Sequence, residues 1–483
     1  MDRFHKEIAT RLGSKVYFGG HWYMIRMFNH WFTWRSVAGI LFDFSFLIVS
    51  LFISLMWINS GLPINVMQVL SFTVIFGLVM LTINSLLGLY QRVAARSSAE
   101  TRARAVLSLY LAIPVAYGLY ALLPISTVNR DLIQLSAMSA AFGMLVTRVG
   151  ASHTSATKML RRRIMVFGTG HQALAVKQAL DRSDPSAQII GFFPGSSEDQ
   201  PQVPSNLILS RDKSLTDSAR NLNADEIVVA LTERRGGAMP LRELLDCKLQ
   251  GVRVLDLASH FEQTLGQIRL DSLYAGWLIF GDGFGQGLIR TVVKRIFDII
   301  CASILIALSL PVMIVVAILI ALEDGFPLLY RQERVGLNGR LFNVIKFRSM
   351  RRDAEKDGKP IWAQAKDNRV TRLGQLIRKL RIDELPQLFS VLKGDMSLVG
   401  PRPERPFFVD QLTKEIPFYA VRHSVKPGVT GWAQVRYHYG ATVEDSAEKL
   451  QYDLYYVKNH SLFLDIVVLF ETVGVVLTGK GAH

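Results

Sequence analysis

The sequence has few of the residues that build disulfide or cysteine–metal scaffolds. Its 483 residues contain two cysteines, Cys247 and Cys301, which lie far apart in dissimilar surroundings. We therefore expect neither a disulfide framework nor a cysteine-based metal site. No nucleic-acid-binding motif stands out, so the net charge of +15 points to an anionic membrane face rather than to DNA or RNA. A cleaved signal peptide is not expected either, because the first apolar run starts too late and is too long.

What the chain has in abundance is hydrophobic residues in long runs, and these residues make up half of the sequence. Four runs are long enough, or nearly so, to cross a hydrocarbon core of about 30 Å, and they lie at 36–58, 66–90, 105–124 and 131–149. Arginines gather after the second and the fourth run, whereas the other two connections are nearly uncharged. By the positive-inside rule we predict a four-helix transmembrane bundle over 36–150, with both ends in the cytoplasm and a basic cytoplasmic segment over 1–35 before it.

Strand and helix patterns alternate over 160–280, which predicts a Rossmann-like α/β domain with a parallel sheet. Strands are expected around 163–167, 189–193, 226–231 and 252–257. The turn after the first strand carries Gly168, Gly170 and Ala173, which fit a relaxed dinucleotide fingerprint. The second strand lacks at its end the acid that would bind a ribose. A nucleotide loop and a fold retained for packing, assembly or regulation both stay open, and the second is favoured.

A glycine-rich joint begins the linker 281–293. It lacks the Gly-Lys-Ser/Thr ending of a phosphate loop, so we interpret it as flexible. An apolar run then fills 294–324, with Pro311 near its middle. Because proline removes a backbone hydrogen bond, we predict a re-entrant helix–break–helix that enters one leaflet and returns, with the Ser309 hydroxyl as a donor to a freed carbonyl. A straight span is the alternative, and it would place the basic remainder of the chain outside the cell.

The remaining residues, 325–483, are predicted to form an α/β catalytic domain anchored by this membrane helix. A β-hairpin is expected over 329–347, with its turn at Asn338-Gly339. Lys346 and Arg348 stand two apart at the end of the second strand, so both side chains could face one anion. An exposed basic edge is the alternative interpretation of this pair.

The segment 378–405 carries the chemistry. Asp383 and Glu384 are adjacent carboxylates just before Pro386, and proline is tolerated in the first turn of a helix. Asp383 is then expected near a helix N-cap, where free N–H groups and the helix dipole favour an anion such as phosphate. A carboxylate held among cations can be a nucleophile or a magnesium ligand. The alternative is that Asp383 only caps its helix.

A rigid turn closes this segment. Arg402 stands between Pro401 and Pro403, and Glu404 follows. Fixing φ on both sides of an arginine lowers the cost of holding its guanidinium against a phosphate or a nucleotide. We therefore expect this turn to bind such a group.

Two motifs together carry a family resemblance. The first is Asp-Glu-Leu-Pro-Gln over 383–387, and the second is Gly-Asp-Met-Ser-Leu-Val-Gly-Pro-Arg-Pro over 394–403. This pair resembles the bacterial sugar transferases, the polyisoprenyl-phosphate hexose-1-phosphate transferases of the monotopic superfamily. The resemblance runs from about Lys294 to the C-terminus. The four spans and the α/β domain match the large architecture of this family of phosphoglycosyl transferases, as in undecaprenyl-phosphate glucose phosphotransferases.

The resemblance implies transfer of a hexose 1-phosphate from a UDP-sugar to undecaprenyl phosphate with release of UMP, as the first membrane step of exopolysaccharide, capsule or O-antigen synthesis. Asp383 would be the nucleophile that forms an aspartyl phosphosugar, and Glu384 would act as a base or help Asp383 to hold Mg²⁺. Motif positions that would contact phosphate or nucleotide are Arg378, Arg402, Lys346, Arg348, Pro401, Pro403 and Glu404, and Asp395 also matches. Glucose is the first expectation for the hexose and galactose the second, on family frequency alone.

The same resemblance implies UDP-hexose, undecaprenyl phosphate and membrane lipid as partners, and no nucleic acid. It leaves a homodimer open, and it implies downstream glycosyltransferases. The chain would be a multi-pass protein of the bacterial inner membrane with its soluble domains in the cytoplasm. One alternative class is a non-enzymatic membrane scaffold with a nucleotide-sensing α/β domain. Another is a glycosyltransferase that releases UDP, although no Asp-x-Asp metal site is evident in the C-terminal part.

Overall fold

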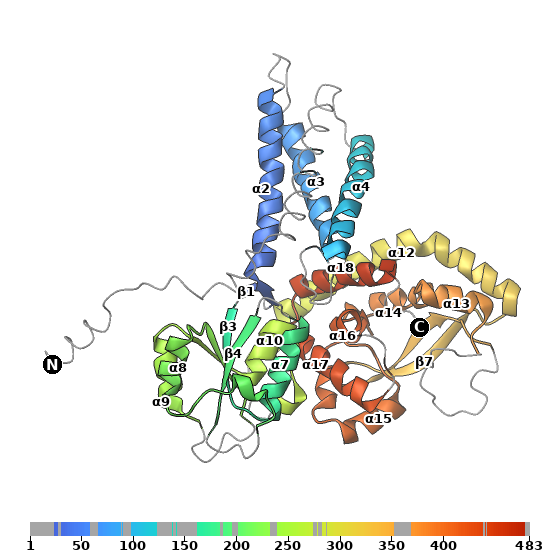
Figure 1. Cartoon of the computed structure of the whole chain (residues 1–483). Helices are drawn as coiled ribbons and strands as arrows, with labels where there is room; N and C mark the ends of the chain where they lie inside the picture. The colour runs from blue at the N-terminus through green and yellow to red at the C-terminus, as the bar shows by residue number, and fades with distance from the viewer. Residues whose placement is uncertain are drawn as a thin grey trace.

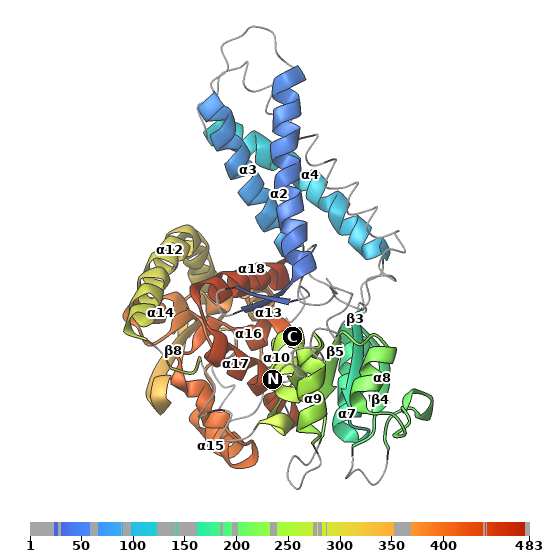
Figure 2. The same ribbon diagram turned by 90° about the vertical axis from the view of Figure 1, so that its left-hand side faces the viewer.

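The computed structural model of the chain has three parts: a bundle of long helices, a small domain with a parallel sheet, and a larger C-terminal domain (Figure 1). In both views the helical bundle stands to one side of the two sheet-containing domains (Figure 2). Apart from a few single residues, the structure describes residues 24–27, 30–57, 66–87, 98–122, 162–183, 187–195, 201–231, 239–273, 283–285, 287–351, 369–437 and 442–478.

The described helices of the bundle pack side by side and are α2 (Trp34–Trp57), α3 (Val66–Leu86) and α4 (Ser98–Leu122). A hairpin of β1 (Met24–Met27) and β2 (His30–Thr33) precedes them. They correspond to the first three predicted runs, whereas the fourth, at 131–149, falls almost entirely outside the described residues. Among the residues that the structure describes, one helix, α12 (Leu288–Asp324), is long and apolar enough to cross a membrane. The four-span bundle therefore stays a prediction.

The central domain is built on a four-stranded parallel sheet with the strand order β4-β3-β5-β6. Its strands are β3 (Arg162–Phe167), β4 (Ala187–Phe193), β5 (Glu226–Val229) and β6 (Arg253–Asp256). The helices are α7 (His171–Ser183), η1 (Ser205–Leu207), α8 (Leu215–Asn221), α9 (Leu241–Leu249) and α10 (Leu257–Leu265). Successive side chains of β3 enter two different cores, with Ile164 and Val166 on one face of the sheet and Met165 and Phe167 on the other. The predicted parallel α/β domain is confirmed.

The long apolar helix α12 is continuous. α12 contains 37 residues, includes Pro311, and curves along the C-terminal domain (Figure 1). The predicted break into two helices is therefore wrong. A proline removes only its own N–H from the ladder, and the turns on either side keep theirs, so the helix bends without ending. The helix also starts at Leu288, inside the segment predicted as linker, because no helix breaker follows Gly287.

The predicted role of Ser309 is also wrong. The carbonyl that loses its partner to Pro311 is that of Ala307, four residues earlier. The Ser309 hydroxyl instead lies 3.5 Å from the carbonyl oxygen of Ile306. It lies 3.6 Å from the sulfur of Met313 as well, so this serine makes only long contacts within its own helix.

The C-terminal domain begins with the predicted hairpin. β7 (Leu329–Val335) pairs antiparallel with β8 (Leu341–Phe347). The chain turns through η3 (Leu337–Gly339), where Asn338 and Gly339 have φ values of 53° and 78°. Asparagine and glycine are the residues that accept such left-handed conformations, so the turn is confirmed.

Short helices and one small parallel sheet complete this domain. They are α13 (Arg372–Lys379), η4 (Ile382–Glu384), α14 (Gln387–Lys393), β9 (Ser397–Val399), α15 (Pro406–Glu415), η5 (Tyr419–Ser424), β10 (Gly428–Thr430), α16 (Trp432–Arg436), α17 (Val443–Asn459) and α18 (Leu462–Thr478). β9, which lies within the second motif of the family resemblance, pairs in parallel with β10. A shared core of apolar side chains from both strands, α14 and α17 surrounds them.

Both ends of α12 are fastened to this one domain. Near the N-terminal end, Arg295 donates to the carbonyls of Val391 and Leu392 at the end of α14, both at 2.6 Å. At the C-terminal end, Arg348 donates to the carbonyl of Gly325 at 2.7 Å. Cations at a helix C-terminus satisfy carbonyls that have no partner within the helix. α12 therefore lies along the domain and does not stand away from it.

The central domain is joined to the C-terminal domain by buried polar contacts. The indole N–H of Trp432 donates to the carbonyl of Gly266 at 2.8 Å. The main-chain N–H of Ile268 donates to the carbonyl of Gln451 at 3.0 Å, and the side chain of Ile268 belongs to the core of the C-terminal domain. η2 (Leu270–Ser272) follows directly. The end of the central domain is thus packed into its neighbour.

Gly428→Ala is expected to destabilise the fold strongly. A Cβ at this position would overlap main-chain atoms of Gly400 and Thr430, which cannot move aside as a flexible side chain could. We expect the free energy of unfolding to fall by on the order of 3 kcal/mol, measured as a lower thermal midpoint of the purified protein. Gly285→Ala is the matched control, because its Cβ would meet no described atom within 4 Å. An unchanged midpoint for Gly428→Ala would contradict this packing.

Candidate functional site

The two adjacent acids lie on a one-turn helix between α13 and α14. α13 ends at Lys379, and Arg381 adopts a left-handed conformation with a φ of 57°, which redirects the chain. η4 then carries Asp383 and Glu384, and each of these two residues is only 8% exposed. Pro386 holds the N-cap position of α14, so Asp383 does not cap that helix as predicted. The left-handed residue starts a separate turn before the proline, and this turn shifts the acids away from the helix end.

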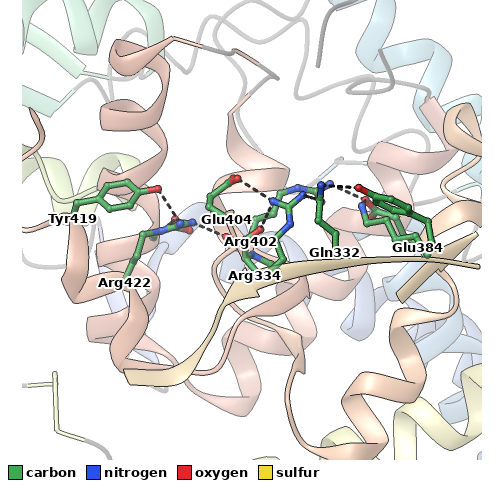
Figure 3. Close-up of polar contacts among 11 residues, drawn as sticks. Gln332, Arg334, Glu384, Arg402, Glu404, Tyr419 and Arg422 are labelled. Atoms are coloured by element: carbon green, nitrogen blue, oxygen red, sulfur yellow. Dashed lines mark hydrogen bonds and ion pairs between the residues drawn. The ribbon is translucent and has the colours of Figure 1, made fainter. Parts of the chain in front are cut away.

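Glu384 is surrounded by cations. Its Oε1 accepts from Arg402 Nη2 at 2.8 Å and from Lys346 Nζ at 3.0 Å, and Arg381 Nη1 lies 3.9 Å from Oε2 (Figure 3). Burial alone would raise the pKa of Glu384, but these three charges hold it well below its usual range. Glu384 is therefore a fixed anion that orients Lys346 and Arg402.

Asp383 has no such partner. Within the described ranges, no hydrogen bond or ion pair reaches its carboxylate. Burial and the neighbouring Glu384 charge raise the pKa of Asp383 to about 6, while Lys346, Arg378 and Arg402 act against this rise. A buried, unpaired carboxylate that still ionises at neutral pH has the properties of a nucleophile.

The turn that carries Arg402 is held at every carbonyl from residue 401 to residue 404. The donors are Gly428 N for Pro401 at 3.0 Å, Arg422 Nη2 for Arg402 at 2.9 Å, Arg334 Nη1 for Pro403 at 3.0 Å and Val335 N for Glu404 at 2.9 Å. These donors come from β7, η5 and β10, and β7 lies far from the other two elements in the sequence. The prolines and these four bonds together leave the main chain of the turn little freedom.

The structure brings Lys346 and Arg402 to the acids, but it does not bring Arg348. Arg348 donates to the carbonyl of Asp324 at 2.9 Å and pairs with the Asp324 carboxylate at 3.1 Å, so it caps α12. The alternation that would place it beside Lys346 fails because β8 ends at Phe347. Arg378 lies close enough to act on the charge of Asp383.

The other predicted residues lie elsewhere. Glu404 pairs with Arg334 at 3.3 Å behind the turn, and Asp395 pairs with Lys393 at 2.8 Å on the surface. Pro401 and Pro403 are buried in the turn. Ser309 and Pro311 lie in α12, and Gly168 and Gly170 lie in the central domain.

The glycine turn of the central domain has the conformation of a strand-to-helix turn. Gly168 has a φ of 126°, and its N–H donates to the carbonyl of Phe193 at 2.8 Å. The carbonyl of Thr169 accepts from the N–H of Gln202 at 2.8 Å, so the segment after β4 crosses the turn. Nucleotide binding by Gly168 and Gly170 stays a prediction.

Two arginines of this site, Arg334 and Arg422, were not predicted from the sequence. Arg334 had a usable signal, because Gln332 and Arg334 stand two apart on β7 and their side chains meet at 2.6 Å. No local pattern marks Arg422. Its partner Asp453 lies 31 residues away on α17, and only the fold brings the two together.

The acids could hold Mg²⁺ only together with an anionic substrate. Among the described residues there is no group of three or more His, Cys, Asp or Glu side chains that could hold a metal ion. Magnesium is commonly bound by one or two carboxylates together with substrate phosphates and waters. The unpaired carboxylate of Asp383 fits such a site, whereas the oxygens of Glu384 already face cations.

Comparisons with known proteins point to one class. Residues 289–479 match the model of a protein family described as bacterial sugar transferase. A UDP-N-acetylgalactosamine-undecaprenyl-phosphate N-acetylgalactosaminephosphotransferase of Aeromonas hydrophila is 46% identical over 242 residues, which are 50% of this chain and 56% of that protein.

Two relatives carry another sugar in their names. A UDP-glucose:undecaprenyl-phosphate glucose-1-phosphate transferase of Caulobacter vibrioides is 42% identical over 193 residues, 39% of this chain and 72% of that protein. A protein of the same name from Xanthomonas campestris pv. campestris is 31% identical over 337 residues, 67% of this chain and 68% of that protein. The similarity to the Xanthomonas protein thus extends beyond the 191 residues from 289 to 479 that match the family.

The two acids should affect stability in opposite directions. Because the pKa of Asp383 is raised on folding, its charged form destabilises the fold at neutral pH, and Asp383→Asn should stabilise the protein by on the order of 2 kcal/mol. This gain should shrink as the pH falls through about 6, because the wild-type carboxyl then becomes protonated. The measurement is the thermal midpoint of both proteins at pH 7.5 and pH 5, without added magnesium.

Glu384→Gln serves as the comparison. The pKa of Glu384 is lowered by its cations, so its charged form stabilises the fold, and its removal should lower the midpoint at pH 7.5. A stabilising Glu384→Gln, or an Asp383→Asn gain that does not depend on pH, would contradict the electrostatics described here.

Proposed function

Because this chain belongs to the bacterial sugar transferase family, we propose that it transfers a hexose 1-phosphate from a UDP-sugar to undecaprenyl phosphate and releases UMP. The observation that supports this proposal is that two adjacent carboxylates differ in their charged partners. Glu384 is neutralised by Arg402 and Lys346, whereas the buried carboxylate of Asp383 is left without a partner among the described residues. Such a carboxylate is suited to attack phosphorus.

The reaction proceeds in two displacements. An Asp383 oxygen attacks the phosphorus that carries the sugar, the bond from that phosphorus to UMP breaks, and UMP leaves with the electron pair. This step gives an aspartyl phosphosugar. An oxygen of undecaprenyl phosphate then attacks the same phosphorus, the bond to Asp383 breaks, and the carboxylate is restored.

No general base is needed in either step. A carboxylate and a lipid phosphate are both anions at neutral pH, so neither has to lose a proton before it attacks. Glu384, whose pKa is held low by its cations, is poorly suited to take a proton. We therefore assign Glu384 to orienting Lys346 and Arg402, in place of the base role that the resemblance implied.

The cations around the acids oppose the negative charge that gathers at phosphorus. Arg402 and Lys346 are held at the acids, and Arg378 lies close enough to act on Asp383. A magnesium ion bound by Asp383 and the donor diphosphate would supply further positive charge. Fixed cations of this kind lower a barrier because they need no reorganisation during the reaction.

The donor sugar is the open part of the proposal. The relatives named above carry either glucose or N-acetylgalactosamine in their names. UDP-glucose is our first choice of donor, and UDP-galactose and UDP-N-acetylgalactosamine are tested beside it. The lipid product would be the starting point of a surface polysaccharide, to be extended by downstream glycosyltransferases.

We also propose that α12 enters and leaves the membrane on the cytoplasmic side. The contacts of Arg295 and Arg348 support this, because they fasten both ends of the helix to one domain. A helix that crossed the bilayer would leave only one end beside that domain. With the predicted four spans, this arrangement gives a multi-pass protein of the inner membrane whose central and catalytic domains face the cytoplasm.

The decisive assay measures UMP release from a panel of UDP-sugars with undecaprenyl phosphate and magnesium. We expect turnover with one donor and a loss of at least about 1,000-fold in Asp383→Asn, because the nucleophile is removed. Asp410→Asn is the matched control, since Asp410 is an exposed acid on α15, and it should keep wild-type activity. Release of UDP would point to ordinary glycosyl transfer. No turnover from folded protein would point to a scaffold.

A labelling experiment tests the membrane arrangement. Asn338→Cys in the hairpin turn and Ser210→Cys in the central domain are both exposed positions, and each is made in a Cys247→Ser, Cys301→Ser background. A maleimide reagent that cannot cross membranes should label both cysteines in inverted vesicles and neither in intact spheroplasts. Labelling of Asn338→Cys from the outside would mean that α12 crosses the membrane.

A further inference from the structure

Arg422 lies on the side of Arg402 that faces away from Glu384 (Figure 3). It is only 5% exposed. Its Nε and Nη2 donate to Asp453 at 3.0 and 2.7 Å, and its Nη1 donates to the Tyr419 hydroxyl at 3.1 Å. Nη2 also donates to the main-chain carbonyl of Arg402 at 2.9 Å. Three elements, η5, α17 and the turn, therefore meet at one guanidinium.

This guanidinium is not free to bind a substrate. Of the five N–H groups of an arginine, one on Nε, one on Nη1 and two on Nη2 are already used. The Asp453 carboxylate neutralises its charge and is itself buried, and the ring of Tyr419 lies 5.2 Å from the guanidinium carbon. Any effect of Arg422 on the reaction must pass through the groups that it holds.

The bond to the Arg402 carbonyl limits a main-chain torsion that the prolines do not fix. Pro401 and Pro403 each fix their own φ, and Pro403 restricts Arg402 to extended conformations. The plane of the peptide between Arg402 and Pro403 still depends on ψ of Arg402. A hydrogen bond to that carbonyl from a buried, doubly anchored guanidinium fixes the plane, and with it the direction in which the Arg402 side chain leaves the turn.

We propose that Arg422 is a positioning residue for the transfer reaction. Anchored by Asp453 and Tyr419, it holds the main chain of Arg402 so that the Arg402 guanidinium faces Glu384 and the donor phosphate in one orientation. The proposal rests on the proposed function, because it assigns a phosphate contact to Arg402. A competing explanation is that the buried pair of Arg422 and Asp453 only stabilises the domain.

Arg422→Lys separates these explanations. Lysine keeps a positive charge beside Asp453, but its compact ammonium with three N–H groups cannot reproduce the four bonds that the guanidinium makes from three nitrogens. We expect kcat/KM for the UDP-sugar to fall by on the order of 10- to 100-fold, since small misplacements of a catalytic group are costly. Arg331→Lys, an exposed arginine on β7, is the matched control and should keep wild-type kinetics.

A double-mutant cycle with Arg402→Gln gives the deciding readout. If Arg422 acts through Arg402, adding Arg422→Lys to Arg402→Gln should change kcat/KM by less than about 2-fold. An equal loss from Arg422→Lys in both backgrounds would overturn the proposal, and so would full activity of Arg422→Lys in the wild-type background. A radiolabelled UDP-sugar allows the low residual rates of the variants to be measured. If Arg402→Gln has no measurable activity, Arg402→Lys takes its place in the cycle.

A second variant, Tyr419→Phe, tests the same proposal. If Arg422→Lys does not fold, Tyr419→Phe removes only the hydroxyl that anchors Nη1, and it should lower kcat/KM by about 3-fold in the wild-type background alone. An equal loss in both backgrounds would again overturn the proposal. Absence of turnover by the wild-type protein would instead count against the proposed function, so the two failures can be told apart.

Discussion

Two adjacent carboxylates buried in one turn are the constraint on which the rest of the C-terminal domain depends. Burying even one anion is costly, and two neighbouring anions also repel each other. Three cations offset this cost: Lys346 from β8, Arg402 from the proline turn, and Arg381, which directly precedes η4. All three face Glu384, so the compensation is unequal and the charge of Asp383 is left to oppose folding. The charged carboxylate of Asp383 therefore lowers the stability of the fold, which is a common property of reactive groups in functional sites.

The same elements hold the site against α12. Lys294 of this helix pairs with Asp465 of α18 at 2.7 Å, and the Tyr456 hydroxyl lies 2.6 Å from the same carboxylate and 3.0 Å from the carbonyl of Val399 in β9. Asp298 of the helix accepts from the N–H of Leu398 in β9 at 3.3 Å. The strand that leads into the proline turn is thus bonded to α12 directly and through Tyr456 and Asp465. In the proposed reaction the lipid phosphate meets the site near the bilayer surface, and this network would hold the proline turn at a fixed distance from α12.

The sequence predicted those features of the fold that depend on residues close together along the chain. Asn338-Gly339 predicted a hairpin turn, and the alternation of strand and helix patterns predicted the parallel sheet, because these features depend on a few neighbouring residues. The sequence also indicated the two acids and Arg402. It could not show that Arg348 caps α12, since the end of β8 decides which way that side chain points. The break at Pro311 was wrong because a single lost hydrogen bond is weaker than the packing of a long helix on its domain. Arg422 was missed because its role depends on Asp453 and Arg402, which are brought to it only by folding.

The boundary of the packed catalytic unit differs from the boundary of the family match. The match begins at residue 289, but Ile268 already belongs to the core of the C-terminal domain, and the Gly266 carbonyl satisfies the indole of the buried Trp432. Glu262, at the end of the central domain, accepts from Lys458 at 2.8 Å and from Asn459 at 3.0 Å. A fragment that started at residue 289 would leave these donors and the Trp432 pocket without their partners, which costs free energy for each buried group. Because Gly431 packs against Gly400 beside the proline turn, the central domain supports, through Trp432, the same main chain that holds Arg402. The central domain is therefore part of the scaffold of the site, whether or not its glycine turn binds a nucleotide.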